Sequence, residues 1–131
     1  MMWMDSMDTR KPIIPIYTSR GDVEVFLVYP HLFNLQGEWI GFVTPEREVY
    51  SVLGHYVGYL NNDPRLLRKR ALEVTKPRLT PPTRPRKVYP PATFPLAPLM
   101  SELYQDTMDV LLEEPERLHT LDAGDLREDL D

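Results

Sequence analysis

The sequence predicts a small all-β domain made of successive β-hairpins, followed by a proline-rich tail. Two observations lead to this prediction. The first is a motif ending in glycine that recurs at Gly21, Gly37 and Gly54, with spacings of 16 and 17 residues. The second is the distribution of the 14 prolines, eight of which lie within residues 77–98. Because proline lacks the backbone N–H that regular strands and helices use, we expect this stretch to be extended.

Each copy of the motif has the residues of a hairpin turn. An aliphatic and an aromatic residue come first, then Thr, Asn or Ser, then two variable residues and the glycine. Thr, Asn and Ser bond back to the backbone at the first position of a type I turn, and glycine accepts the positive φ that closes a hairpin with a bulge. A fourth, degenerate copy is expected at residues 66–74, with its turn at Ala71 in place of glycine. We therefore predict four sequential antiparallel hairpins within residues 13–76.

The residues after each glycine align in one register and are the candidate strands. An aromatic column falls five residues after the glycines, at Phe26, Phe42 and Tyr59. Gly41 and Gly58 lie inside these strands, where glycine commonly marks a bulge or the close approach of another backbone. Since a single hairpin is marginally stable in water, the hairpins must bury their faces against one another.

The repeated pattern of an aromatic residue, a turn glycine and a second glycine next to an aromatic residue resembles the four-fold beta-flower domain family of bacterial proteins. The first copy departs from the family pattern, because it carries Glu24 and Val25 where the others have an aliphatic residue and glycine. The resemblance covers about half of the chain, residues 13–77. It implies four hairpins around a pseudo-fourfold axis, in a family mostly without assigned function. The matching segments are Tyr17 to Phe26, Phe33 to Phe42 and Tyr50 to Tyr59.

Charge is separated along the tail. Residues 65–87, the basic arm, hold nine basic residues and one acid, whereas residues 101–131, the acidic block, hold eleven acids and two arginines. The chain therefore contains a cationic segment although its overall net charge is −5. The basic arm would bind phosphates by counterion release. The acidic block on the same chain can screen it by association in cis.

An amphipathic helix is predicted in the tail at residues 99–114, centred on 102–114, because Pro115 forbids its continuation. Residues 1–12 are expected to be disordered, and residues 115–131 to be frayed or only transiently helical. The apolar residues that recur at helical spacing are Leu99, Leu103, Met108 and Leu111.

No catalytic residue, cofactor site or metal site is predicted. The chain has no cysteine, which removes thiolate zinc sites and cysteine nucleophiles, and its three histidines have no second ligand at a suitable spacing. Glu24 stands in an otherwise aliphatic column, and we expect an open first hairpin to expose it. No apolar run approaches the ~20 residues that span a bilayer. We therefore expect a cytoplasmic protein that is not an enzyme and has no transmembrane segment.

The favoured function is a non-enzymatic binding or scaffold module for a protein partner, with the tail helix docking either in cis or on the partner. The alternative is peripheral binding of anionic lipid or of nucleic-acid phosphates through the basic arm. Trp39 and Tyr56 belong either to the core or to an apolar platform, and the oligomeric state stays open. The candidate partner-binding residues are Trp39, Tyr56, Arg65, Arg68, Lys69, Arg70, Leu103, Met108 and Leu111.

Overall fold

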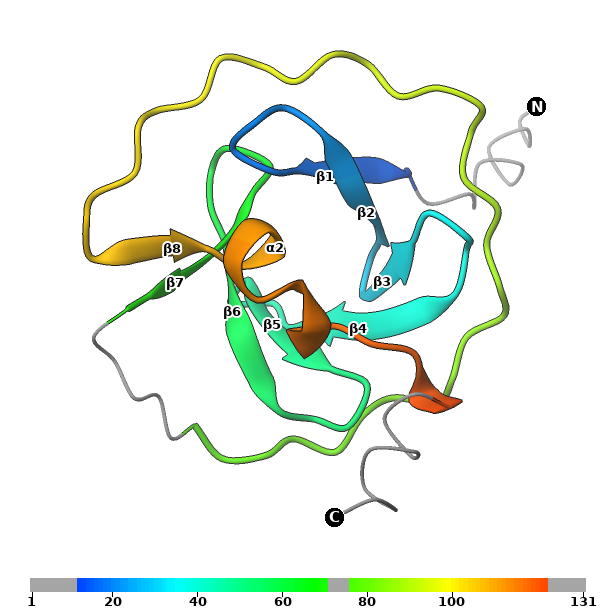
Figure 1. Ribbon diagram of the computed structural model, residues 1–131. Coiled ribbons are helices and arrows are strands. Elements are labelled where there is room, and N and C mark those ends of the chain that lie inside the picture. Colours follow the sequence, from blue (N-terminus) through cyan, green and yellow to red (C-terminus); the bar gives the residue numbers. More distant parts are fainter. Residues whose placement is uncertain (1–11, 71–75, 123–131) are drawn as a thin grey trace, which may run out of the picture.

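A curled antiparallel sheet surrounds a short helix in the computed structural model, which describes residues 12–70 and 76–122 (Figure 1). An eighth strand, β8 (Thr107–Asp109), precedes helix α2 (Val110–Glu113) and a short 3-10 helix (Pro115–Arg117). The all-β class is confirmed. The first seven strands are β1 (Ile14–Tyr17), β2 (Val23–Val28), β3 (His31–Asn34), β4 (Trp39–Val43), β5 (Glu48–Ser51), β6 (Tyr56–Leu60) and β7 (Leu66–Lys69).

The sheet curls until its two ends come close to each other. Neighbouring strands pair antiparallel in the order β1 to β8. Just after β1, the N–H of Ser19 donates to Oδ2 of Asp109 at the end of β8 (2.6 Å), and the N–H of Tyr17 donates to the carbonyl of Pro64 (2.7 Å). These bonds form the seam of a half-barrel.

Three of the predicted turns are confirmed. Gly21, Gly37 and Gly54 have φ angles of 89°, 84° and 89°, which glycine adopts without steric cost. In each turn the glycine N–H donates to the carbonyl three residues earlier, at 2.9 Å. The side-chain oxygen of that earlier residue, in turn Thr, Asn or Ser, accepts a backbone N–H two residues further on. A register shift next to each turn is the predicted bulge.

Of the predicted fourth hairpin, the structure describes only the first strand, β7. Ala71 and the rest of residues 71–75 lie outside the described residues. However, β7 pairs with β6 on one side and with β8 on the other, where Arg68 stands opposite Met108. Both edges of β7 are therefore filled, by β6 and by β8. The tail supplies the second of these strands, whose Met108 is buried in the aliphatic core.

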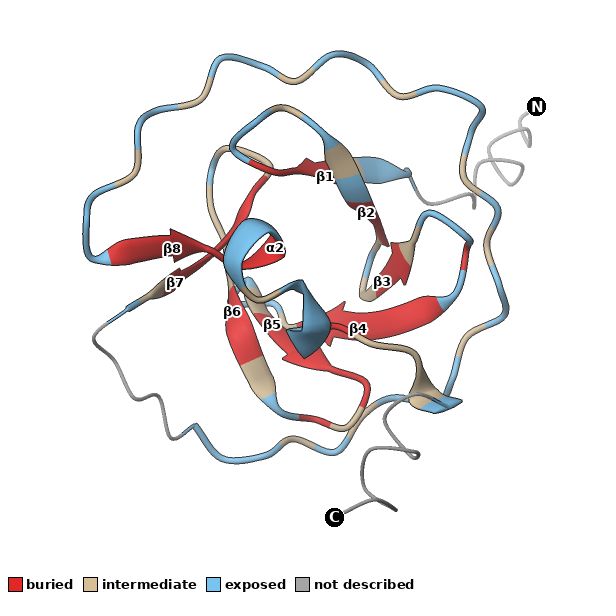
Figure 2. Cartoon of the chain, viewed as in Figure 1, coloured by how far each residue is buried: buried red, intermediate tan, exposed pale blue. Residues whose placement is uncertain are grey.

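The sheet is covered on both faces, as the burial pattern of Figure 2 shows. β4, for example, is buried along its whole length. On one face an aliphatic cluster includes Ile40 and Val57 together with Met108, Leu111 and Leu118 from the C-terminal segment. On the other face an aromatic cluster contains Phe26, Phe33, Trp39, Phe42, Tyr50 and Val52.

The predicted helix at 102–114 is wrong for most of its length. Met108 lies on β8, and only the four residues of α2 are helical. The open edge of β7 explains the difference, because Thr107–Asp109 satisfies backbone groups of β7 that a helix would leave unpaired. Residues 115–122 are not frayed, contrary to the expectation, because Leu118 is buried in the aliphatic cluster. Residues 1–11 and 123–131 lie outside the described residues.

Candidate partner-binding surface

The proline-rich part of the tail runs around the outside of the sheet (Figure 1). We call residues 76–106 the strap. The strap contains no regular helix or strand, and it passes the three glycine turns in reverse order, from the third to the first. Two of the contacts are hydrogen bonds, of 3.0 and 3.1 Å, from a strap N–H to the carbonyl of a turn glycine. These bonds join Leu79 to Gly54 and Val88 to Gly37, while at the first turn Ala97 is the strap residue nearest to where a Cβ of Gly21 would lie.

The strap contacts recur every nine residues, at positions 79, 88 and 97. A further step of nine reaches Asp106, whose carbonyl accepts the N–H of Arg70 next to β7 (2.7 Å). The sequence contains the signal for this arrangement in two copies of an aliphatic-x-Pro-Pro motif, which begin at Leu79 and Val88. The predicted extended stretch at residues 77–98 is a linker without contacts of its own, and that prediction does not include this repeat.

The turn glycines therefore have a second role besides their positive φ. A Cβ atom on Gly54 would overlap the carbonyl oxygen of Leu79, and one on Gly37 would overlap the carbonyl oxygen of Val88. A Cβ on Gly21 would lie 3.7 Å from the nearest strap atom, an ordinary contact. Two of the three turns thus need glycine so that the strap can lie directly on them.

Large apolar side chains of the strap point into solvent. Leu96 and Leu99 are 95% and 101% exposed, and Tyr89 and Tyr104 are 75% and 81% exposed. The inward side of the strap contrasts with this, since Leu79, Val88 and Phe94 are half-buried against the aromatic cluster. The strap thus has a side that holds it to the sheet and a side that is free for contacts.

Ion pairs fasten β7 and the adjoining Arg70 to the last residue of the strap and to the segment that follows it, and we call this set of pairs the clasp. Nζ of Lys69 lies 3.2 Å from Oδ2 of Asp106, and the Arg70 guanidinium makes two bonds, of 2.5 and 2.7 Å, to the Glu113 carboxylate. Arg68, which is buried, donates to Glu114 at 2.5 Å.

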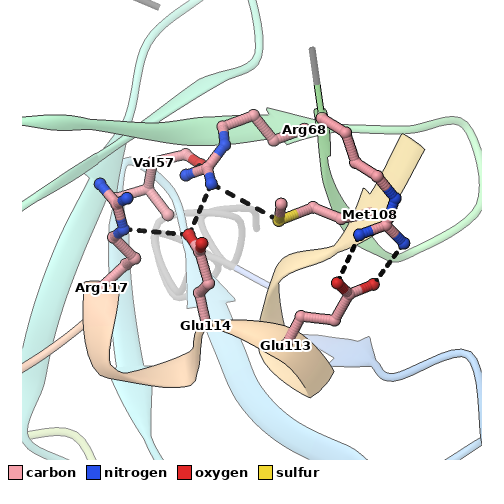
Figure 3. A network of polar contacts seen from close by, with 7 residues as sticks. Val57, Arg68, Met108, Glu113, Glu114 and Arg117 are labelled. Carbon is pink, nitrogen blue, oxygen red and sulfur yellow. Dashed lines mark hydrogen bonds and ion pairs between the residues drawn. The ribbon is translucent and has the colours of Figure 1, made fainter. Parts of the chain in front are cut away.

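Figure 3 shows the environment of Arg68 in the clasp. Its guanidinium also reaches the carbonyl of Val57 (3.4 Å) and the sulfur of Met108 (3.5 Å), while Arg117 donates to the same Glu114 oxygen (3.0 Å). The hydrogen bond from Arg68 holds the pKa of Glu114 below its ordinary value, and Arg70 does the same for the pKa of Glu113. Both carboxylates are therefore stabilised in the charged form that the clasp needs.

The structure places the two aromatic candidates differently. Trp39 is only 6% exposed and belongs to the aromatic cluster, so it is a core residue. Tyr56 is half-buried at the margin of that cluster, and the Lys76 ammonium lies 5.1 Å from its ring centroid. Burial raises the pKa of the Tyr56 hydroxyl. These residues do not form an open apolar platform.

The remaining candidates fall into two groups. Met108 and Leu111 are buried in the aliphatic cluster, where the tail docks in cis. Arg65, Lys69 and Leu103 line one cavity of about 350 Å³ between the β6–β7 region and the end of the strap. Arg65 is only 2% exposed and is held by Asp63 (2.7 Å), the Ser101 carbonyl (2.9 Å) and the Ser19 hydroxyl (3.0 Å).

Most of the basic arm is used inside the molecule. Five of its nine cations, Arg65, Arg68, Lys69, Arg70 and Lys76, form ion pairs. Three of these pairs are the clasp and join the basic arm to the acidic block, which is the expected screening in cis. None of the ion pairs among the described residues includes the exposed Arg84, Arg86 or Lys87.

Glu24 is exposed, as expected. Within residues 12–70 and 76–122, no cluster of three or more histidine or carboxylate side chains could hold a metal ion. In the same part of the chain, no helix has the length and apolar character needed to cross a bilayer. No protein-family model, curated protein or solved structure matches the chain.

Proposed function

We propose that this protein is a non-enzymatic binding module that presents the outer side of its strap to a protein partner. The observation that carries this proposal is the exposure of Tyr89, Leu96, Leu99 and Tyr104 on a segment that is already held in place. Burying a leucine side chain contributes roughly 1.5 to 3 kcal/mol. A segment that is ordered before binding loses less conformational entropy when a partner contacts it.

Leu96 and Leu99 are the centre of the proposed contact. They are three residues apart, which places them on the same edge of an extended polyproline-type segment. The Tyr17 hydroxyl donates to the carbonyl of Pro95 (2.6 Å), which holds the backbone directly before Leu96. Tail docking in cis through Met108 and Leu111 fixes the other end of this stretch.

We also propose that the hairpins are related by a pseudo-fourfold axis, as in the beta-flower family that the sequence resembles. Three local hairpins, and a fourth made by β7 with β8, would be the four units. The spacings of 16 and 17 residues between turn glycines and of nine residues between strap contacts support this arrangement.

The binding proposal is tested with a Leu96→Ser/Leu99→Ser variant of the whole chain. Leu112→Ser is the matched control, because Leu112 is also exposed but lies on helix α2. A partner captured from the native host would then be purified and titrated against the three proteins. We expect the wild-type chain and the control to bind equally and the double variant to lose at least tenfold in affinity, or ~1.4 kcal/mol. Equal binding by all three proteins would refute a contact at this edge.

The exposed cations Arg84, Arg86 and Lys87 favour a second candidate function, which is weak binding to an anionic surface. Removing the acidic block would be a poor test, because it also removes Met108 and Leu111 from the core. Charge reversal by Arg84→Glu/Arg86→Glu is cleaner. We expect the wild-type chain to bind phosphatidylserine vesicles or an oligonucleotide only at low salt, and the variant not to bind. Equal binding by both proteins would exclude this stretch as the contact.

A further inference from the structure

We infer that residues 80–87 of the strap are a ligand for a polyproline-binding groove with an acidic rim on a partner protein. The inference rests on the proposed function in one respect, because it also requires the outer side of the strap to be accessible. It concerns a different stretch from Leu96 and Leu99, so the two can fail separately.

The pattern of prolines and cations in this stretch is the first support. Pro82 and Pro85 are three residues apart, and Lys87 follows two residues later. Two prolines at this spacing would contact the same groove in a regular polyproline II helix, which has three residues per turn, and of the two Pro82 is the exposed one. Segments with this proline spacing dock in aromatic-lined grooves. A cation next to the second proline adds a contact for carboxylates at the rim of such a groove.

The conformation of the stretch is the second support. Its two ends are fixed, because the N–H groups of Leu79 and Val88 donate to the carbonyls of Gly54 and Gly37. Between these anchors the stretch contains no regular helix or strand. A groove would therefore meet a segment whose ordering has already occurred on folding. Six of the eight residues are exposed and Pro81 and Pro85 are half-buried; the exposed ones are Thr80, Pro82, Thr83, Arg84, Arg86 and Lys87.

The charge of the stretch is the third support. Five cations of the basic arm have carboxylate partners, whereas Arg84, Arg86 and Lys87 take part in none of the ion pairs among the described residues. Arg84 and Arg86 are thus available to the acidic rim, whereas the Lys87 ammonium lies 5.3 Å from the centroid of the Tyr89 ring and would exchange that contact for the rim. The second aliphatic-x-Pro-Pro copy, which contains Pro90 and Pro91, has no cation between Ala92 and Met100. It offers a matched control with similar backbone and no charge.

The experiment uses the whole chain and a panel of purified SH3 domains with acidic rims, with binding measured by calorimetry. A synthetic peptide of residues 78–89 is titrated in parallel. The variants are Pro82→Ala/Pro85→Ala, Lys87→Glu and the control Pro90→Ala/Pro91→Ala. Hydrogen exchange at the Leu79 and Val88 amides shows whether the strap is still anchored in each variant.

We expect at least one domain to bind the whole chain more tightly than the peptide, since the peptide must still be ordered. The Pro82/Pro85 and Lys87 variants should lose about tenfold in affinity while keeping protected amides, and the Pro90/Pro91 control should bind as the wild type does. Three results would overturn the inference. They are binding by the peptide but not by the chain, no binding by either, and equal losses for both proline pairs. Binding of the wild-type chain to phosphatidylserine vesicles but to no domain would instead assign the cations to a membrane surface and also overturn it. The Leu96→Ser/Leu99→Ser variant should bind the domain as tightly as the wild type does. A failure of the polyproline inference therefore leaves the test of the Leu96 and Leu99 contact valid.

Discussion

Replacing the turn glycines by alanine separates their two roles, because the three turns share a backbone conformation but differ in their contact with the strap. Alanine at a positive φ costs roughly 1 to 2 kcal/mol at any of these turns. In Gly21→Ala nothing else is disturbed, since the nearest strap atom is 3.7 Å from the new Cβ. In Gly54→Ala the new Cβ would overlap the Leu79 carbonyl oxygen, so the strap must move away.

The additional cost in Gly54→Ala follows from the contacts that the strap would lose. The hydrogen bond from Leu79 to Gly54 contributes about 0.5 to 1.5 kcal/mol. Leu79 is half-buried against the aromatic cluster, and losing that burial costs about 1 kcal/mol more. We therefore expect the free energy of unfolding to fall by about 1.5 to 2.5 kcal/mol more for Gly54→Ala than for Gly21→Ala.

Urea unfolding followed by circular dichroism would measure this difference, with equal m-values as the check that both variants unfold from comparable states. Hydrogen exchange gives an independent reading, because the Leu79 amide should lose protection only in Gly54→Ala. Equal destabilisation of the two variants, with a protected Leu79 amide in both, would refute the second role of the glycine.

Other perturbations test the clasp and the sheet. Glu114→Gln removes the carboxylate that Arg68 needs in its buried position, so we expect a loss of about 2 to 3 kcal/mol in urea unfolding. Because the folded-state pKa values of Glu113 and Glu114 are lowered, their contribution to stability is present above the ordinary carboxyl pKa and is lost as the pH falls through the folded values. The urea midpoint should therefore decline in acid, and less steeply in Glu114→Gln; parallel curves would contradict this. Gly58→Ala should lower the melting temperature strongly, because its Cβ would overlap the Leu67 carbonyl oxygen on the neighbouring strand, and an unchanged melting temperature would contradict that contact.

Local chemistry made the first three hairpins predictable from the sequence. Each turn is specified within four residues, by an oxygen-bearing side chain at the first position and by a glycine at the last. The glycines inside strands were informative for the same reason. A Cβ on Gly41 would overlap the Tyr50 carbonyl oxygen, which is the close backbone approach that glycine at this position indicated.

The tail was less predictable because its conformation is decided by distant partners. Leu103, Met108 and Leu111 have helical spacing, yet the unfilled edge of β7 favours a strand at Met108. In the structure that edge is filled by Thr107–Asp109. Arg65 and Arg68 belong to the basic arm in the sequence, yet both are buried. Besides the neighbouring Asp63, Arg65 bonds the Ser19 hydroxyl and the Ser101 carbonyl, which are distant in the chain. The partner of Arg68, Glu114, lies 46 residues after it. No local pattern reports such a pairing.

The pairing of β7 with β8 has a consequence for the order in which the protein is built. The two strands are separated by 37 residues along the chain, and closing a flexible loop of that length costs on the order of 3 kcal/mol in entropy. On the ribosome, the three local hairpins can form while the strap is still being synthesised. During that interval β7 has an open edge, and Arg68 has neither its carboxylate nor its methionine contact. A nascent chain is therefore open to wrong strand pairing until Thr107 to Glu114 emerges, and chaperone binding should be concentrated in that interval.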